Sequence, residues 1–394
     1  MKKIITGVKS TGSSMHLGNL MGAVLPFGRT AVGNDAAIFI ADLHSLTSVK
    51  NGQTLREQTL EVAIEYLAIY GVDTPITIFR QSDIHQITQL MWILTNVTAY
   101  SLMLRSHGLK EFQQKIDNLK DGISNLLWGT RALSEYMDTL EQNPLSDLEL
   151  QKLLVEKCRL QIEKWSADRK IKELDLLHIE ENFEKSFNMW VFNYPILMAA
   201  DIIGYDCEAV PVGKDQIQHL EMTRDIVRAF NKTYGQEVFI EPEAIIDEAV
   251  ATLPGVDGRK MSKSYDNFIG IFDDDKTLKK RVMSIVSGSE WVDERKKNPD
   301  ECNIYNLYRV FATPEQTAEM RVKYESENIG FGYGHAKTEL LSVLTEYLAP
   351  YRATREQLLQ DIPFVEAKLA EWAAIMNARL EEKMRVVKEM VGVN

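Results

Sequence analysis

A histidine among small residues near the amino end of the chain has the pattern of a phosphate-binding segment. Residues 11–19, with the sequence TGSSMHLGN, lie between a predicted strand at 3–8 and a helix predicted to begin after His16. A helix amino terminus offers free backbone N–H groups and positive potential to a phosphate chain, and His16 could add a donor. Gly18 would let a flat base approach the backbone closely. Taken alone, these residues are equally consistent with a plain strand-to-helix turn.

A second candidate segment, far along the chain, is basic. Residues 258–264 have the sequence GRKMSKS and follow a Pro-Gly turn at 254–255. Lys260 and Lys263 alternate with small hydroxyl residues on a predicted loop, so their charges could follow a polyphosphate and meet charge that develops in a transition state. A solvated basic surface loop is the alternative interpretation. The presence of the His16 segment in the same chain favours a nucleotide site.

The two segments together resemble the signatures of the class I aminoacyl-tRNA synthetases, which are written HIGH and KMSKS. Residues 260–264 match KMSKS at every position, and residues 16–19 (HLGN) are a variant of HIGH with Asn19 at the last place. Both the tryptophanyl and the tyrosyl branches of this family fit such a match. The resemblance therefore implies ATP-dependent activation of an amino acid and leaves the amino acid open.

Four further segments are similar to the tryptophanyl branch rather than to the tyrosyl branch. They are residues 194–201 (YPILMAAD), 210–219 (VPVGKDQIQH), 42–47 (DLHSLT) and 329–334 (IGFGYG). Apart from a helical insertion in the middle, the resemblance spans nearly the whole chain. It implies a homodimer that converts L-tryptophan and ATP, with substrate-bound Mg²⁺, into tryptophanyl-adenylate and then transfers the tryptophanyl group to the 3′ end of tRNA(Trp).

Asp201 is the residue expected to recognise the indole ring. An indole N–H is only a donor, so a buried carboxylate would pair with it strongly, and an amino acid lacking that donor would leave the carboxylate unpaired. By resemblance, Tyr194, Met198 and Gln216 complete the tryptophan pocket, with Gln216 near the ammonium group. Without the resemblance, Met198 would be assigned to the core and Asp201 to an ordinary helix position.

The resemblance also implies which residues would surround ATP. They are Lys9, Ser10, Thr11, Gly18, Asn19, Gly213, Lys214, Asp215, Val250, Lys260, Met261, Ser262, Lys263 and Ser264. The chain departs from the family pattern in three places. Ser10 stands where many relatives have proline, and one extra residue lies between Gly12 and His16. The helical insertion, of about 70 residues, is longer than an ordinary loop.

The implied reaction is attack of the tryptophan carboxylate on the α-phosphorus of ATP. A carboxylate is already nucleophilic at neutral pH, so positioning and charge stabilisation should dominate and no catalytic base is expected. His16, Lys260 and Lys263 are the expected catalytic residues, because they would stabilise the departing pyrophosphate together with magnesium. No dedicated protein metal site is expected, since substrate phosphates would hold the ion.

The elements that must position these residues alternate along the chain. Apolar, β-rich runs occur at residues 3–8, 36–41, 76–79 and 207–212. Helical patterns between and after them include residues 54–70, 189–203 and 216–230. Such alternation predicts βαβ units, that is, an α/β fold with a Rossmann-like parallel sheet.

The expected division of the chain has four parts. Residues 1–112 and 186–272 would form the two halves of the catalytic domain, and residues 113–185 a helical insertion between them. Residues 273–394 would form a helical domain that binds the tRNA anticodon. Within the insertion, apolar residues recur at helical spacing, which favours a helical hairpin that packs against itself or the body over a cofactor or partner site.

Composition excludes several broad classes of protein. The formal net charge of -12 argues against indiscriminate nucleic-acid binding, although lysines and arginines at 276–281 and 295–297 could form local basic patches. Three widely separated cysteines, Cys158, Cys207 and Cys302, suit reduced thiols better than a disulfide framework.

Membrane and secretory signals are missing from the sequence, which favours a cytoplasmic protein. No apolar stretch is long enough to cross a bilayer, and no cleavable signal pattern follows Lys2 and Lys3. A tyrosyl enzyme and a catalytically silent, RNA-binding regulator are the competing interpretations. The intact His16, Lys260 and Lys263 argue against the regulator.

Overall fold

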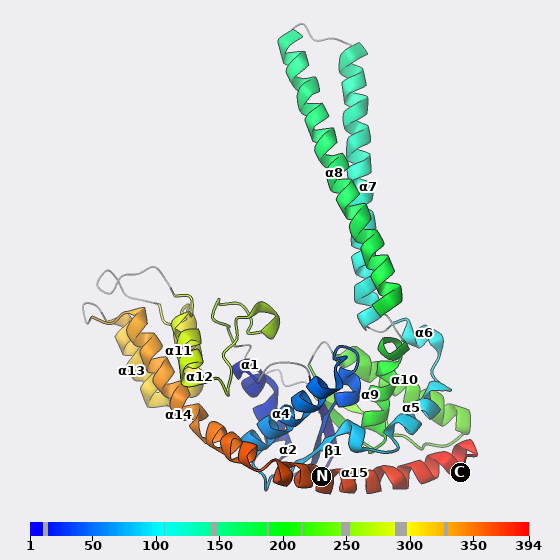
Figure 1. Ribbon diagram of the computed structural model, residues 1–394, viewed down its shortest axis with the longest axis vertical. Helices are drawn as coiled ribbons and strands as arrows, with labels where there is room; N and C mark the ends of the chain where they lie inside the picture. The colour runs from blue at the N-terminus through cyan, green and yellow to red at the C-terminus, as the bar shows by residue number, and fades with distance from the viewer. Residues whose placement is uncertain are drawn as a thin grey trace.

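A parallel sheet lies at the centre of the computed structural model (Figure 1). The structure describes residues 1–10, 15–105, 107–142, 148–186, 189–213, 216–245, 253–287, 298–326 and 330–393. The strands found there are β1 (Lys3–Val8), β2 (Asp35–Ile40), β3 (Thr77–Arg80), β4 (Ala209–Pro211) and β5 (Glu243–Ile245), in the spatial order β3-β2-β1-β4-β5. Every neighbouring pair is parallel, which confirms the predicted Rossmann-like α/β class.

The strand order reverses beside β1. This strand pairs with β2 along its whole length, from Lys3 opposite Asp35 to Val8 opposite Ile40, and with β4 on its other side. The chain therefore builds outward first toward β3 and later toward β5. Open α/β sheets bind their ligands at the carboxyl ends of the strands on either side of such a reversal. The sheet topology alone places the expected site between β1 and β4.

The central strands are apolar because helices cover both faces of the sheet. Ile38, Ile40 and Ile78 are fully buried, as is usual for parallel strands. Four of the strands lie within one or two residues of the predicted runs. The fifth, β5, was not predicted, because it is a three-residue edge strand whose residues are all at least partly exposed. Such a strand has no apolar run to signal it.

Helices surround the sheet. They are α1 (Leu17–Asn19), α2 (Leu25–Ala31), α3 (Asp42–Ser45), α4 (Gly52–Tyr70), α5 (Ile87–Thr95), α6 (Tyr100–Met103), α9 (Met189–Ile203) and α10 (Ile217–Tyr234). The α4, α9 and α10 helices lie close to the predicted runs 54–70, 189–203 and 216–230, and α1 begins directly after His16 as predicted. No range was predicted for α2, α3, α5 and α6. A π-helical turn, Leu20–Val24, joins α1 to α2. In α4, the Asn51 side chain accepts the Thr54 N–H at the amino end, and Gly71, with a φ of 84°, ends the helix.

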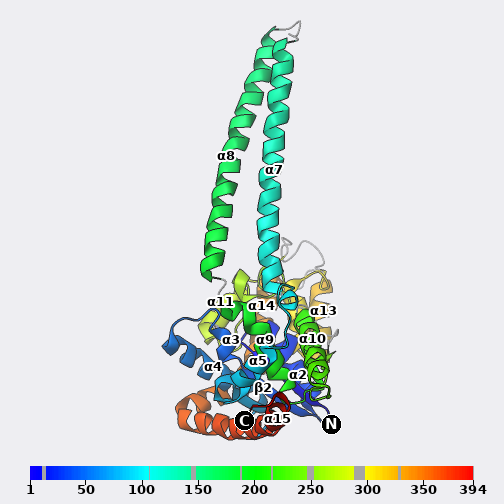
Figure 2. The same ribbon diagram turned by 90° about the vertical axis from the view of Figure 1, so that its right-hand side faces the viewer.

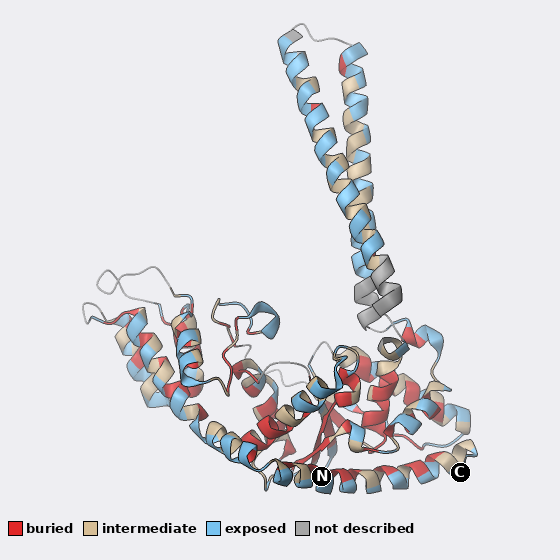
Figure 3. Ribbon diagram, viewed as in Figure 1, coloured by how far each residue is buried: buried red, intermediate tan, exposed pale blue. Residues whose placement is uncertain are grey.

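Two long helices, α7 (His107–Gln142) and α8 (Leu148–Ser186), project from the body as an antiparallel pair. Figures 1 and 2 show the pair from two sides, and in both views it stands clear of the sheet. The helices pack mainly on each other. A Cβ atom on Gly129 would lie 2.7 Å from the Trp165 ring, so a glycine is needed where this ring crosses α7. Exposed residues dominate the surface of the pair (Figure 3).

The remaining helices form the carboxyl-terminal part of the chain. They are α11 (Asp275–Met283), α12 (Asn303–Phe311), α13 (Pro314–Glu325), α14 (Tyr333–Gln360) and α15 (Ile362–Val391). The last of these packs along β3, where Arg80 forms an ion pair with Glu366 at 2.8 Å and Asn377 donates to the Asp83 carbonyl at 2.8 Å. No helix in the described ranges is long and apolar enough to span a membrane.

Candidate active site

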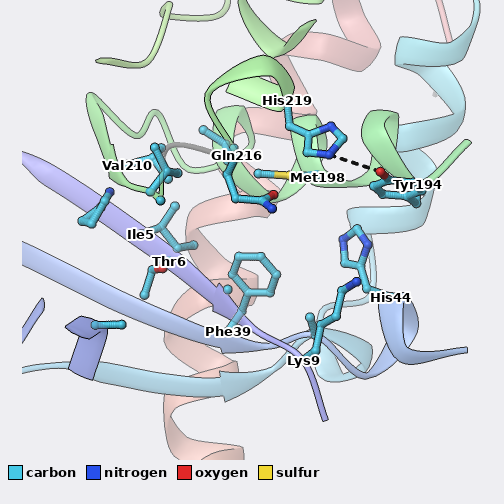
Figure 4. Close-up of a pocket in the computed structure, with 17 residues that line it drawn as sticks. Ile5, Thr6, Lys9, Phe39, His44, Tyr194, Met198, Val210, Gln216 and His219 are labelled. Carbon is cyan, nitrogen blue, oxygen red and sulfur yellow. Dashed lines mark hydrogen bonds between the residues drawn. The ribbon is translucent and has the colours of Figure 1, made fainter. Parts of the chain in front are cut away.

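A pocket of about 570 Å³ lies beside β1 and β4, at the reversal of the strand order (Figure 4). Its lining residues come from β1, β2, α3, α9, β4 and the start of α10. They are Ile5, Thr6, Gly7, Lys9, Ala23, Phe39, Ala41, His44, Tyr194, Met198, Ile202, Val210, Pro211, Val212, Gly213, Gln216 and His219. Most of these side chains are apolar, and the few polar groups converge from several elements. This composition is typical of a site for a small molecule with one flat apolar part.

The floor of the pocket depends on a glycine. A Cβ atom on Gly7 would lie 2.4 Å from the Phe39 ring, so any other residue here would displace that ring. The Phe39 ring packs against Phe79 in the core, with the ring centroids 6.4 Å apart and the ring planes tilted by 36°. The ring therefore has a fixed place beneath the pocket, between β1 and the α9 side of the site.

Aromatic and imidazole rings form the wall on the α9 side. The Tyr194 hydroxyl lies 3.1 Å from His219 Nε2, the contact drawn as a dashed line in Figure 4. The Tyr194 ring meets the His44 ring edge-on, with centroids 6.3 Å apart. Tyr194 is thus held between two histidines that come from α3 and α10. The wall is preorganised, because each ring restrains its neighbour.

Asp201 lies behind this wall rather than among the lining residues. It is 2% exposed, and both of its carboxylate oxygens accept hydrogen bonds from Gln81 Nε2, at 2.9 and 2.7 Å. His44 Nε2 lies 3.0 Å from Asp201 Oδ2. Burial raises the pKa of the Asp201 carboxyl, whereas these hydrogen bonds favour its charged form. The nearby charge of Asp42 adds to the upward shift of the pKa.

His16 caps the first turn of α1. Its Nδ1 accepts the Asn19 backbone N–H at 3.2 Å, and the Asn19 side chain accepts the His16 N–H at 3.3 Å. Burial, together with the charge of Lys263, lowers the pKa of His16 to about 4. The imidazole is therefore neutral at pH 7, and because Nδ1 is an acceptor, Nε2 carries the proton. His16 can offer one hydrogen-bond donor without being a cation.

The loop that carries Lys260 and Lys263 packs against the His16 segment. The Gly18 N–H donates to Met261 Sδ at 3.3 Å, and Met261 is buried. On the other side of the segment, the Leu17 N–H donates to the Ile269 carbonyl at 2.9 Å. A Cβ atom on Gly18 would lie 3.0 Å from the His16 ring, so a larger residue would disturb this junction. The structure therefore brings the two sequence signatures into contact.

Asn267 holds the lysine loop in shape. Its Oδ1 accepts the Ser262 N–H at 2.8 Å, and its Nδ2 donates to Asp257 Oδ1 at 2.7 Å and to the Lys260 carbonyl at 3.1 Å. Asn267 is buried, whereas Lys260 and Lys263 are exposed residues. Partial burial of the Lys263 ammonium lowers its pKa, and the charge of Glu65 opposes that shift. The loop thus has a fixed base and two lysines on its outer side.

The residues assigned to ATP fall into separate groups. Lys9 and Gly213 line the pocket, and Gly18, Asn19 and residues 260–264 belong to the junction at α1. Ser10 turns into the protein, because its N–H and hydroxyl both donate to Ser45 Oγ, at 3.1 and 3.0 Å. Four of the assigned residues lie outside the described ranges, namely Thr11, Lys214, Asp215 and Val250.

The residues assigned to tryptophan are gathered on one side of the pocket. Tyr194, Met198 and Gln216 line it, and Asp201 follows Met198 on the same face of α9, one turn farther along. In the part of the chain that the structure describes, no group of three or more histidine, cysteine, aspartate or glutamate side chains could hold a metal ion.

Four residues of the site received no role from the sequence. His44 and His219 lie inside segments that resemble the tryptophanyl branch, so this resemblance could have pointed to them. Phe39 lies in the apolar strand β2 and Gln81 directly follows β3. Residues at such positions would ordinarily be assigned to the core. Only the folded sheet brings Gln81 to Asp201, because the two residues come from different βα units.

Comparison with known proteins agrees with this geometry. The family model described as tRNA synthetases class I (W and Y) matches residues 1–128 and 166–349. The tryptophan–tRNA ligase of Fusobacterium nucleatum is 36% identical over 394 residues, which is 100% of this chain and 98% of the relative. That of Pseudomonas putida is 35% identical and aligns with 99% of this chain and 74% of its own length.

A solved structure is similar over the whole chain. The tryptophanyl-tRNA synthetase from Campylobacter jejuni, complexed with ADP and tryptophan, has a TM-score of 0.76 and 29% sequence identity. The similarity covers 99% of this chain and 100% of the Campylobacter chain. The family model, in contrast, leaves out residues 129–165, a stretch whose described residues, 129–142 and 148–165, belong to α7 and α8.

Proposed function

The chain belongs to the class I tRNA synthetases (W and Y), and we propose that the pocket and the junction at α1 together activate L-tryptophan with ATP. Its activity is that of a tryptophan–tRNA ligase. Tryptophan and ATP give tryptophanyl-adenylate and pyrophosphate, and the tryptophanyl group then passes to the 3′ end of tRNA(Trp). One observation carries the assignment of the site: the lysine loop is packed onto the His16 segment beside an apolar pocket that is backed by a buried carboxylate.

The indole ring occupies the space between Met198 and Phe39, with Tyr194 along its edge. Asp201 accepts the indole N–H from behind the wall. A carboxylate has about four acceptor positions, and Gln81 and His44 occupy three in the described contacts, so one is left for the ligand. The hydrogen bonds from Gln81 keep the carboxylate in place. Gln216 lies where it can meet the ammonium group of the substrate.

ATP lies between the pocket and the α1 junction. The Campylobacter protein holds ADP together with tryptophan, and we assign the same pair of subsites to this chain. Lys9 and Gly213 contact the nucleotide where it meets tryptophan, and Gly18 and Asn19 lie along it. Magnesium bound with the nucleotide would neutralise phosphate charge, and the phosphates would supply most of its ligands.

The catalytic residues act on the leaving group. As pyrophosphate departs, negative charge grows on its oxygens, and His16 Nε2–H, Lys260 and Lys263 stabilise that charge. The tryptophan carboxylate is ionised at neutral pH and attacks without help from a base. Because the lysines are on the outer side of their loop, they can follow the phosphates as these separate from the adenylate.

The carboxyl-terminal helices bind the tRNA. We assign residues 273–394 to recognition of the anticodon, residues 1–112 and 186–272 to catalysis, and residues 113–185 to a separate helical insertion. Lys276, Lys279 and Lys280 are exposed on α11, where they can contact phosphates of an RNA backbone. A local patch of this kind compensates for the overall net charge of -12.

The active protein is a homodimer that forms through the first half of the sheet domain. Trp92 on α5 is 71% exposed and Tyr100 on α6 is 69% exposed, and both helices pack on α9, where Met189 is exposed too. Large exposed apolar side chains on neighbouring elements are typical of an interface. Light scattering should give twice the chain mass of 45.0 kDa. A particle of single chain mass at micromolar concentration would contradict the dimer.

The protein acts in the cytoplasm, where tRNA is charged. Cys158, Cys207 and Cys302 are buried free thiols, a state that suits a reducing compartment. The activity is tested by ATP–pyrophosphate exchange with each of the twenty amino acids in turn. Exchange with tryptophan alone is the expected result. Exchange driven by tyrosine, or by no amino acid, would contradict the assignment.

A further inference from the structure

Glu65 is a buried carboxylate on α4 to which no role in the reaction has been assigned. The residue is 3% exposed. Both of its carboxylate oxygens lie within hydrogen-bond distance of the Met15 N–H, Oε1 at 3.1 Å and Oε2 at 3.2 Å. Taking a carboxylate out of water is costly unless the charge is compensated. An apolar residue at position 65 would pack α4 against the sheet equally well.

Met15 is where the histidine segment meets the lysine loop. Its carbonyl accepts the Ile271 N–H at 2.9 Å, and the next residue, His16, is the amino-terminal cap of α1. A group that fixes the Met15 N–H therefore fixes the starting point of α1. This anchor acts together with the hydrogen bonds of Leu17 and Gly18 to set the position of the His16 ring relative to the loop.

The charge of Glu65 also acts on Lys263. It favours the ammonium form of Lys263, which partial burial disfavours, and the same ammonium lowers the pKa of His16. Three groups from three segments thus influence one another at the junction. Other charges of the loop have different partners: Asp266 accepts from Arg281 at 2.6 Å, and Asp257 accepts from Arg259 at 2.7 Å.

We propose that Glu65 is a positioning residue for adenylate formation, which anchors the His16 segment through Met15 and places a negative charge beside Lys263. This inference rests on the proposed function of the junction. Glu65 touches neither substrate; it acts through His16 and Lys263. Its negative charge favours the ammonium form of Lys263, so that Lys263 and His16 can both act on the departing pyrophosphate when ATP is bound.

The proposal is tested by two substitutions in the full chain, measured by tryptophan-dependent ATP–pyrophosphate exchange from pH 7 to pH 10. Glu65→Gln keeps the size of the side chain and an acceptor for Met15 but removes the charge. We expect kcat to fall about tenfold with an unchanged KM for tryptophan. We also expect the alkaline loss of activity to move to lower pH, because Lys263 loses the charge that favours its ammonium form.

Glu65→Asp separates the two roles of the side chain, because it keeps the charge but shortens the reach to Met15. Its rate should fall while the alkaline limb of the pH profile stays near that of the wild type. Glu57→Gln on the same helix is the matched control, because Glu57 is exposed and bonds only locally, to Gln53 at 2.7 Å. This control should match the wild type at every pH.

Two results would overturn the proposal. One is a Glu65→Gln variant with wild-type kcat and a wild-type pH profile. The other is a loss of activity without any change in the pH profile and with a matching rise in the KM for tryptophan, which would indicate general disturbance of the fold. If Glu65→Gln does not melt cooperatively, it is not folded. The rate and the pH profile of Glu65→Asp then decide whether the proposal holds. Absence of exchange in the wild type would instead count against the proposed function.

Discussion

The proposed tryptophan pocket and the lysine loop differ in how their polar groups are held. In the pocket, Asp201 is buried, and hydrogen bonds from Gln81 and His44 fix it before any ligand arrives. In the loop, a buried residue, Asn267, fixes only the base, and Lys260 and Lys263 remain on the exposed side. A buried, satisfied network is suited to recognising a substrate of constant shape. Exposed cations on a fixed base are suited to charge that moves during the reaction.

In the proposed mechanism, selection and catalysis therefore depend on different physical means within one site. Selection uses a desolvated acceptor, where the wrong ligand leaves a buried group unpaired. Catalysis uses cations that contribute most when charge develops on the leaving group. Substitutions in the two regions should therefore change different kinetic constants.

The largest effect is expected for Lys263→Ala. Adenylate formation should slow by about a hundredfold or more, as is usual when one group that stabilises transition-state charge is removed. Tryptophan binding should hardly change. Single-turnover measurement of adenylate formation, with tryptophan affinity measured separately, checks both parts. Lys232→Ala, at an exposed lysine on α10, is the control. A normal rate combined with weak tryptophan binding would erase the distinction between the two regions.

Asp201→Ala should have the complementary effect. Loss of a charged hydrogen bond costs about 1.5–3 kcal/mol, which corresponds to a drop of at least about tenfold in kcat/KM for tryptophan. Gln81 and His44 also lose their acceptor, so the melting temperature should fall and must be measured on the same sample. An unchanged kcat/KM for tryptophan in a folded variant would remove Asp201 from the recognition of the substrate.

A smaller effect is expected from the titration of His16. The pKa of this residue is about 4 in the folded protein, against an ordinary 6.5, so the unfolded chain binds more protons between these values. The free energy of unfolding should therefore decrease as the pH falls from 6.5 toward 4. Urea unfolding of the wild type and of His16→Ala at pH 7 and pH 5 checks this slope. If both proteins lose the same stability on acidification, His16 is not the neutral, buried group described here.

The smallest effect is expected from removal of the helical insertion. Replacement of residues 113–185 by a short Gly/Ser linker should preserve tryptophan-dependent exchange, because α7 and α8 pack mainly on each other and away from the pocket. A modest loss of exchange activity would still agree with this prediction, since Tyr194 lies shortly after the end of the replaced segment. Thermal melting must first show that the variant is folded. Complete loss of exchange in a folded variant would make the insertion part of the active site.

Much of the fold was predictable, because the signals are local. The range of α9 is identical to the predicted 189–203, since an apolar run of helical length identifies a buried helix. The α7 and α8 helices extend a few residues beyond the expected insertion, His107–Gln142 and Leu148–Ser186 against 113–185. The edge strand β5 was missed because three partly exposed residues carry no periodic pattern.

The site was less predictable, because its key contacts are tertiary. The sequence motifs identified His16 and the lysines, and the contact between Gly18 and Met261 joins them. No spacing along the chain indicates that Gln81 donates to Asp201, or that Ser10 turns toward Ser45 instead of a ligand. Resemblance can assign roles to residues that match a motif, whereas the partners that hold those residues must be found in three dimensions.

The position of α15 has a consequence for synthesis on the ribosome. The helix is made long after β3, yet its buried Val365, Leu369 and Trp372 belong to the core, and the helix packs along β3, an edge strand of the sheet. An edge strand without its cover can pair with other chains. Until α15 has been made, β3 lacks this protection, so we expect the nascent chain to depend on chaperones until this helix is released.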